Sequence, residues 1–169
     1  MNRSITNCLF SLLLVLGACT KPLDPKVHFD KGNYAEAYQL WLAQAEQGDV
    51  VAKNYIGILY YLGLGTPRDY RKARHWFEQA ANQGYADAQY NLGSMYENGE
   101  FFDIDYMKAY MWLFAAHKNG NTHAANRMWG ITGDHKLFGN QVARAEKLAE
   151  PYINRKSDQQ TKVQNESIP

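Results

Sequence analysis

The sequence contains little cysteine and almost no net charge, and both shortages exclude classes of function. Cys8 and Cys19 are the two cysteines among 169 residues, and Cys8 lies in an N-terminal segment that we expect to be removed. One remaining cysteine allows neither an intramolecular disulfide nor a cysteine-based zinc site. The 18 Lys and Arg residues nearly balance 17 Asp and Glu residues, and loss of Arg3 would make them equal. A neutral chain lacks the basic patches that attract nucleic acid, so we expect no nucleic-acid partner.

Catalytic motifs are also missing. The sequence has no Gly-x-Ser-x-Gly nucleophile turn, no phosphate-binding loop and no His-Glu-x-x-His pair. Five histidines lack metal-ligand spacing: His28, His75, His117, His123 and His135. A cluster of acidic residues could hold a cation, but helix capping is the simpler interpretation: Glu97, Glu100, Asp103 and Asp105. We therefore predict a protein that is not an enzyme and that holds no metal and no cofactor.

Long apolar runs are absent except near the N-terminus. Residues 9–16 form one short run, which follows the basic Arg3 and precedes the small residues Gly17 and Ala18. A bilayer-spanning helix needs about 20 apolar residues, so this run is too short to cross a membrane. A basic start, a short apolar stretch and small residues before a cleavage point are typical of a secretory signal. We predict that residues 1–18 are a signal peptide.

Residues 16–19, Leu-Gly-Ala-Cys, resemble the lipobox of exported bacterial lipoproteins. In that family cleavage falls before the cysteine, whose thiol carries diacylglycerol and whose new amino group is acylated. The resemblance implies lipidation of Cys19 and a lipid anchor, because several acyl chains hold a protein on a membrane more firmly than one. Thr20 stands where an Asp tends to retain lipoproteins at the inner membrane, which implies the outer membrane, facing the periplasm. The alternative is an ordinary signal cleaved after Ala18, with a free cysteine.

Several residue types recur with a period of 36 residues. The recurring positions are Tyr34, Tyr70 and Tyr106; Ala37, Ala73 and Ala109; Gly48, Gly84 and Gly120; and Ala52, Ala88 and Ala124. A period in this range is typical of a helical solenoid, in which each unit buries its apolar face against its neighbours. We therefore predict an all-α fold, a short α-solenoid of antiparallel helix pairs.

Apolar residues at three- and four-residue steps predict the helices of this array. The predicted helices cover 34–47, 51–62, 66–83, 86–98, 106–119, 122–130 and 142–150, with a loop at 132–134. The last helix has one polar side and is expected to cap the array. Residues 19–29 contain Pro22 and Pro25 and are expected to form an extended tether before a repeat domain at 30–151. Residues 152–169 are polar and are expected to be disordered.

Two stretches, 52–77 and 86–112, share small, Leu-Gly or Ile-Gly, Tyr and Gly positions and resemble the Sel-1-like repeat, a relative of the tetratricopeptide repeat. The family phasing implies full units at about 49–84 and 85–120. Gly57 and Gly93 lie inside helices, where Gly costs about 0.5–1 kcal/mol relative to Ala. A repeated cost predicts a repeated close contact, for which Trp76 and Trp112 are candidates. Trp129 stands at the third equivalent position, so we expect the array to end there.

In this family and its relatives, the first helix of each pair lines a concave face that binds peptides or protein segments. The positions off the apolar stripe are the candidates for that face here, and tyrosine and arginine among them are enriched at protein interfaces. They are Asn54, Tyr55, Ile58, Tyr61, Asp87, Tyr90, Asn91, Ser94, Glu97, His123, Asn126 and Arg127. The alternative is a solvated face whose tyrosines help to fill the core.

The function that these observations favour is that of an envelope lipoprotein that acts as an adaptor or scaffold. Its expected partners are a protein or peptide segment and, through the lipid anchor, a membrane. A second hypothesis is a cell-wall or β-lactamase-like enzyme, as described for some cysteine-rich secreted relatives, although this chain lacks their repeated cysteine pairs. A third hypothesis is an oligomerisation or host-contact module at the cell surface.

Overall fold

The computed structural model describes residues 23–100 and 103–154. The predicted signal peptide, Cys19 and most of the predicted C-terminal tail lie outside the described residues. The described residues form helices and contain no strand, so the prediction of an all-α fold is confirmed. None of the helices among them is long and apolar enough to cross a membrane.

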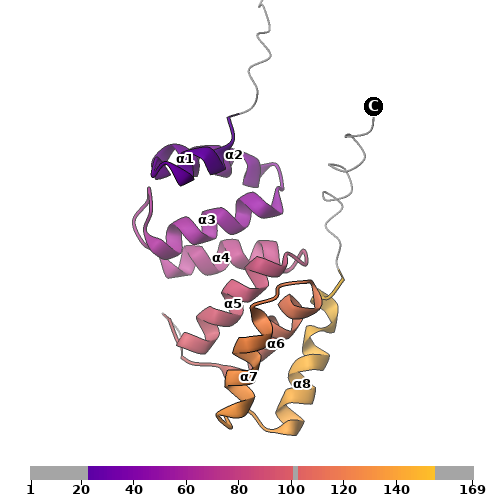
Figure 1. The fold of residues 1–169 in the computed structure, drawn as a ribbon. Helices are drawn as coiled ribbons and strands as arrows, with labels where there is room; N and C mark the ends of the chain where they lie inside the picture. The colour runs from indigo at the N-terminus through magenta and orange to yellow at the C-terminus, as the bar shows by residue number, and fades with distance from the viewer. Residues whose placement is uncertain (1–22, 101–102, 155–169) are drawn as a thin grey trace, which may run out of the picture.

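The helices follow one another as a stack of hairpins (Figure 1). Their bounds are α1 (Pro25–Asp30), α2 (Tyr34–Glu46), α3 (Val50–Leu62), α4 (Tyr70–Ala81), α5 (Ala86–Asn98), α6 (Tyr106–Lys118), α7 (Ala124–Gly133), α8 (Gly139–Ala149) and the 3-10 helix η1 (Glu150–Tyr152). Helix α3 pairs with α4 and α5 pairs with α6, while α2 packs on α3 and α4 packs on α5. The predicted solenoid of helix pairs is therefore present.

Three aspartates determine where helices of the array begin. The Asp49 carboxylate accepts the backbone N–H groups of Val51 and Ala52, at 2.8 and 2.9 Å. Asp69 caps α4 in the same way, and Asp105 accepts the Lys108 N–H at the start of α6. Such caps satisfy amide groups that have no partner inside the helix. For Asp105 this confirms helix capping as the role of one member of the acidic cluster.

Gly57 and Gly93, each inside the first helix of a repeat, mark a close approach between the two helices of that repeat. A Cβ placed on Gly57 would lie 2.5 Å from the Phe77 ring, and a Cβ on Gly93 would lie 2.7 Å from Leu113. The predicted close contact is therefore present, but the prediction that Trp76 and Trp112 make it was wrong. Phe77 and Leu113 each come one residue later, and one residue is a rotation of about 100° around a helix. That rotation points Phe77 and Leu113 directly at the partner helix.

The prediction of an extended tether at 19–29 was wrong for its last residues, because Pro25–Asp30 form α1. Pro at the first helical position has a favourable φ and lacks only an N–H that would have no helical partner. Asp24 has extended backbone angles, as the residue before a proline should, and its carboxylate accepts the Lys26 N–H at 2.9 Å. The proline therefore begins a helix, and α1 packs on α2 as the first element of the array.

The predicted boundaries at the C-terminal side also need correction. Helix α7 runs to Gly133 through the predicted loop at 132–134, because Ile131 is fully buried and the Thr132 hydroxyl donates to the Met128 carbonyl. The predicted tail begins at 152, but Tyr152 belongs to the fold. Its ring packs on Trp112 with 4.6 Å between ring centroids.

The last helix pair departs from the repeat geometry. Helix α8 packs mainly against α6, and Ala145 of α8 shares a buried cluster with Ile131 of α7. Trp129 on α7, at the position equivalent to Gly57 and Gly93, is 77% exposed. The array therefore ends at this residue, as expected from the sequence, and α8 caps α6 while leaving one side of α7 uncovered.

Candidate protein-binding face

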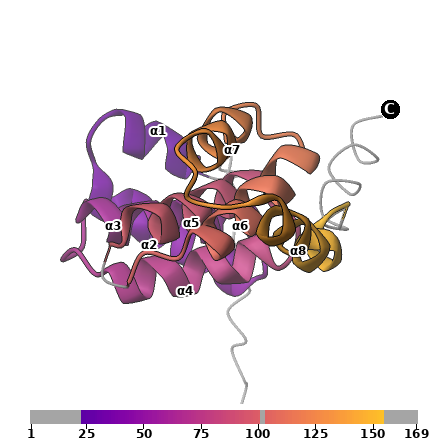
Figure 2. The same cartoon turned by 90° about the horizontal axis from the view of Figure 1, so that it is seen from below.

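The first helices of successive pairs lie side by side and are joined by hydrogen bonds. The Asn91 side-chain amide on α5 donates to the Asn54 side-chain oxygen on α3, at 3.0 Å. The Arg127 guanidinium on α7 donates to the Tyr90 hydroxyl on α5, at 3.1 Å. We call the surface formed by these helices the α3–α5–α7 face. Seen along the array, α1 and α7 rise on one side and α4 lies on the opposite side (Figure 2).

Arg127 is the most strongly held side chain of this face. Its Nη1 lies 2.7 Å from a Glu97 oxygen, and its guanidinium carbon lies 5.5 Å from the centre of the Tyr90 ring. Burial acts to lower the pKa of Arg127, but the hydrogen bonds with Tyr90 and Glu97 outweigh burial and leave the pKa raised. Charge-assisted hydrogen bonds of this kind restrict both partners. Arg127 and Glu97 therefore fix α7 relative to α5.

Two further polar pairs connect the ends of these helices. The Tyr61 hydroxyl at the end of α3 donates to Glu100 at 2.5 Å, and burial together with this carboxylate raises the pKa of Tyr61. Asp87 at the start of α5 accepts from the Asn121 side-chain amide at 2.8 Å. The oxygen of Asn121 in turn accepts the backbone N–H of His123, which places the start of α7.

Tyr55 lies at the α1 end of the face and is held by aromatic packing. Its ring stacks on Trp41 with 4.1 Å between centroids and 3° between planes, and Phe29 of α1 covers the pair from a third side. A pocket of about 460 Å³ opens beside Tyr55, lined also by Pro25 and Val51. Offset aromatic stacking of this kind adds to the stability that burial alone provides. Tyr55 therefore contributes to the core that joins α1, α2 and α3.

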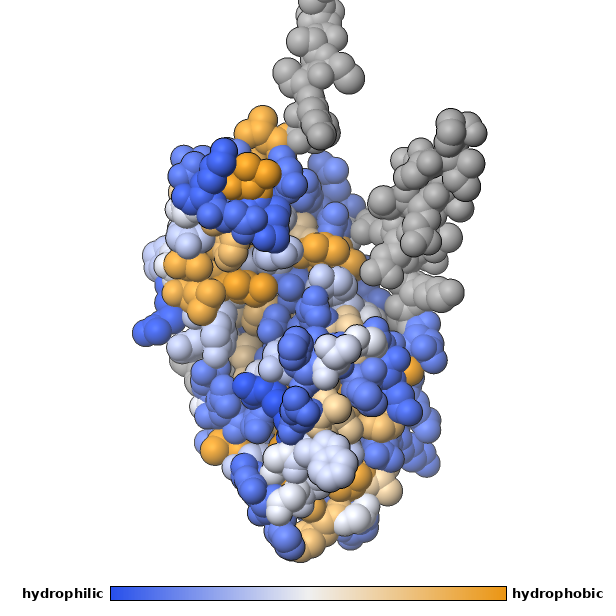
Figure 3. Space-filling view, viewed as in Figure 1, coloured by the Kyte–Doolittle hydropathy of each residue, from blue (hydrophilic) through white to orange (hydrophobic). Residues whose placement is uncertain are grey.

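An apolar patch on α3 remains available on the face. Ile58 is half-buried, and Leu62, one turn further, is 52% exposed. Figure 3 shows hydrophobic side chains gathered over α3 and more hydrophilic ones over α5. Asp87 and His123 are exposed at the starts of α5 and α7, and Asn126 is exposed on α7. Protein-binding surfaces usually combine apolar and polar side chains of this kind.

The predicted face residues therefore fall into two groups. One group is occupied in contacts between helices: Asn54, Tyr55, Tyr61, Tyr90, Asn91, Glu97 and Arg127. The Ser94 hydroxyl donates to the Tyr90 carbonyl within its own helix, at 2.9 Å. The other group presents exposed or half-exposed side chains: Ile58, Asp87, His123 and Asn126, of which Asp87 also accepts from Asn121. Asn54 is so well covered that it is 3% exposed, so it joins helices and is not part of the accessible surface.

Sequence reasoning missed a buried polar cluster behind the face. Gln89 is fully buried and donates to the carbonyls of Ala81 and Tyr152, at 3.0 and 2.9 Å. The Asn119 side-chain amide donates to Gln89 and to the Tyr152 carbonyl. These bonds attach η1 to the turns that precede α5 and follow α6. In the sequence, Gln89 is a single glutamine next to Ala88, and nothing in that pattern predicts a buried hydrogen-bonding role.

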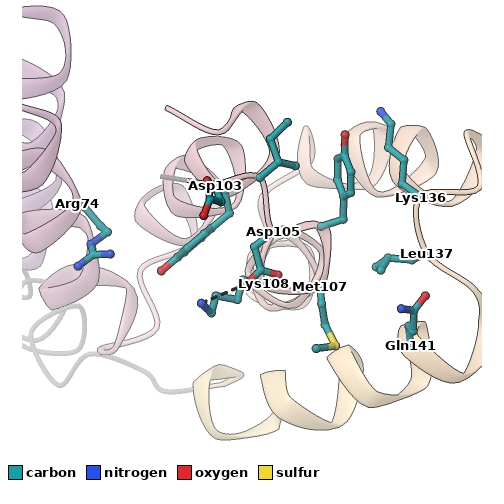
Figure 4. A pocket seen from close by; sticks show the side chains of 11 residues that line it. Arg74, Asp103, Asp105, Met107, Lys108, Lys136, Leu137 and Gln141 are labelled. Atoms are coloured by element: carbon teal, nitrogen blue, oxygen red, sulfur yellow. Dashed lines mark hydrogen bonds and ion pairs between the residues drawn. The ribbon is translucent and has the colours of Figure 1, made fainter. Parts of the chain in front are cut away.

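A second hollow lies on the other side of α6 (Figure 4). This pocket of about 600 Å³ is lined by residues of the 103–105 loop, the start of α6 and α8, including Asp105, Met107 and Gln141. Its lysines are paired, since Lys108 bonds Asp105 at 3.2 Å and Lys136 bonds Asp134 at 3.1 Å. Among the described residues, no group of three or more His, Cys, Asp or Glu side chains could hold a metal ion.

Comparison with known proteins places the repeats in a family. The Sel1 repeat model matches residues 50–85 and 86–121, within one residue of the units expected from the sequence. A crystal structure of a protective antigen from uropathogenic Escherichia coli, described as displaying an SLR fold, superposes with a TM-score of 0.70 at 25% identity. The match covers 86% of this chain and 32% of that one. A Sel1 repeat protein from Oxalobacter formigenes gives a TM-score of 0.63 at 26% identity, over 79% of this chain and 56% of that one.

Among curated proteins, two plant relatives match a shorter stretch. The ERAD-associated E3 ubiquitin-protein ligase components HRD3B and HRD3A of Arabidopsis thaliana are 45% and 43% identical over 51 residues. Those residues are 30% of this chain and 8% of each plant protein. Sel1 repeats generally form non-catalytic scaffolds for protein interaction. The matches therefore support a protein partner at the level of the repeat.

Proposed function

Because this chain is a Sel1-like repeat protein, we propose that it is an adaptor that binds a segment of another protein on the α3–α5–α7 face. The observation that carries this proposal is the combination of a hydrogen-bonded framework and an uncovered apolar patch. Asn54–Asn91 and Tyr90–Arg127 tie three successive helices, while Ile58 and Leu62 stay accessible beside them.

The framework lowers the cost of binding. Side chains that are already held in one conformation lose little entropy when a partner arrives, so more of the contact energy appears as affinity. Arg127 and Tyr90 are held by each other and by Glu97 before any partner is present. The ring of Tyr90 then offers a fixed amphipathic contact, of the type enriched at interface centres.

The apolar patch indicates what kind of segment binds. Ile58 and Leu62 fit an apolar side chain of the partner, and the exposed side chains of Asp87 and His123, at the starts of α5 and α7, fit polar groups elsewhere in the segment. Three helices offer a short surface, so a single helix or a short extended segment is the appropriate size. A partner of this kind agrees with the general role of Sel1 repeats in protein interaction.

A variant of the patch tests this proposal directly. Leu62→Asp places a charge on the patch without opening the core, because Leu62 is 52% exposed, whereas Ile58 packs partly against the core and is left unchanged. Leu148→Asp is the matched control, since Leu148 is similarly exposed on α8. In affinity capture from cells, we expect the patch variant to lose partners that the wild type and the control retain. Identical partner sets for all three proteins, with unchanged helical circular dichroism, would contradict the proposal.

We further propose that the adaptor works in the cell envelope, anchored through Cys19 at the outer membrane and facing the periplasm. The support is the sequence of residues 1–19, with its short apolar run and lipobox-like end. Metabolic palmitate labelling that disappears in Cys19→Ser, together with loss from the membrane fraction, is the expected result. Unchanged membrane fractionation of Cys19→Ser would rule out the anchor, and protease treatment of intact cells would separate periplasmic from surface exposure.

A further inference from the structure

The end of the array at α7 leaves a stacking surface open. Within the two repeats, the first helix of each pair is covered on two sides. Its glycine meets the second helix, as Gly57 meets Phe77, and its outer side meets the first helix of the next pair, as Asn54 meets Asn91. Helix α7 lacks this cover on the side of Trp129, which is 77% exposed, because α8 packs mainly on α6 and the described residues contain no further helix pair. Figure 2 looks along the array from this end.

The uncovered side of α7 has an unusual shape. Asn126, Trp129, Gly130 and Gly133 are its exposed residues, and Trp129 is 77% exposed. A Cβ placed on Gly130 or on Gly133 would meet nothing within 4 Å. The exposed Trp129 ring therefore lies beside two glycines, and the surface next to these glycines has room for a side chain of another molecule. Each of the two repeats pairs a large side chain with a glycine where its own two helices cross, as Phe77 does with Gly57.

The shape and charge of this surface fit a second copy of the chain. Across a two-fold axis, the same surface faces itself, so Trp129 of each copy can lie over Gly130 and Gly133 of the other. A two-fold contact brings identical charges together, and it is favoured when the surface has none. The exposed residues within α7 are uncharged, Arg127 is paired with Glu97, and the exposed Asp134 that caps the helix is paired with Lys136.

We propose that the chain forms a two-fold dimer through α7, with Trp129 of each copy packed over the glycines of the other. This inference rests on the end of the array and does not depend on a partner at the Ile58 patch. Helix α7 has 10 residues, so the area buried is smaller than the roughly 800 Å² per partner of a stable complex. The dimer is therefore expected to be weak and reversible, with a dissociation constant on the order of micromolar or above.

Sedimentation velocity of the intact chain in mild detergent tests this inference, because the detergent suppresses association through residues 9–16. We expect the mass to rise from one to two chains between low micromolar and near-millimolar concentration. Trp129→Ala should weaken the dimer about tenfold or more, as loss of a central tryptophan does at interfaces. Gly130→Leu should also weaken it, since the new side chain fits the free monomer but occupies the partner's place.

Leu62→Ala is the matched control, because Leu62 is also large, apolar and exposed but lies on α3. It should leave the dimer unchanged. A single-chain mass at every concentration, a dimer that is insensitive to Trp129→Ala, or growth beyond two chains would each overturn the inference. Trp129→Ala should at the same time leave partner capture through the Ile58 patch intact, so the two proposals can fail separately.

Discussion

Substitution of two glycines by alanine should change stability in opposite directions, although both lie inside helices. Glycine is a poor helix former, so replacing either Gly57 or Gly130 by Ala should stabilise the helix by about 0.5–1 kcal/mol if nothing else changes. At Gly130 nothing opposes this gain, because a Cβ there would meet no atom within 4 Å. We therefore expect Gly130→Ala to raise the free energy of unfolding by about 0.5–1 kcal/mol.

Gly57→Ala faces a steric cost that exceeds the gain. The new Cβ would lie 2.5 and 2.6 Å from two carbons of the Phe77 ring, which is 2% exposed and surrounded by core. Overpacking a well-packed core costs typically about 1–3 kcal/mol, so the net effect should be a loss of about 1–2 kcal/mol. A smaller side chain at position 77 should remove the clash, and the Gly57→Ala, Phe77→Leu pair should then show favourable coupling.

Urea unfolding followed by circular dichroism measures these differences. The proteins should be compared at low concentration, so that association through α7 does not contribute. The predicted order of stability is Gly130→Ala above the wild type and the wild type above Gly57→Ala. A Gly57→Ala protein that is as stable as Gly130→Ala would refute the close crossing of α3 and α4, and with it the helix spacing described for the repeats.

Three further predictions concern other parts of the fold, and urea unfolding measures each. Asp49→Ala removes both cap bonds of α3 and should cost about 1 kcal/mol, whereas Asp49→Asn should cost less. Gln89→Leu removes the hydrogen bonds of Gln89, while the Ala81 and Tyr152 carbonyls keep Gly84 N–H and Asn119 as donors, so it should cost about 1 kcal/mol. No loss would mean that η1 is not held by this cluster. Burial and the Tyr60 hydroxyl raise the pKa of Tyr38 to about 12, from about 10 in unfolded chains. The folded state therefore holds the Tyr38 proton more tightly than the unfolded state does. This contribution to the free energy of unfolding is present in full below about pH 10 and is lost between about pH 10 and 12. Tyr38→Phe should reduce the loss of stability in that range.

The sequence predicted the repeat architecture because each 36-residue unit uses the same contacts. Ala37, Ala73 and Ala109 are all fully buried, and the family model finds its units within one residue of the predicted ones. The errors lie where the chain stops repeating. Helix α1 depends on a capped proline turn, and the extension of α7 to Gly133 depends on burial of Ile131, and neither follows from the period.

For the candidate face, the residue pattern does not distinguish accessible residues from those that lie between helices. Asn54 lies off the apolar stripe, as Ile58 does, yet α5 covers Asn54 and leaves Ile58 half-exposed. That difference depends on the distance between neighbouring helices, which the residue pattern of one helix does not contain. The same limit explains why the pairing of Arg127 with Glu97 and Tyr90 is visible in the structure alone.

A photo-crosslinking amino acid at position 58 gives the most direct test of protein binding on the α3–α5–α7 face. The full chain would carry it in living cells, and a second version would carry it at position 75, because His75 is exposed on α4 away from this face. We predict that light produces a discrete crosslinked protein from position 58 and none, or a different set, from position 75. No crosslink from position 58, or the same products from both positions, would contradict the account.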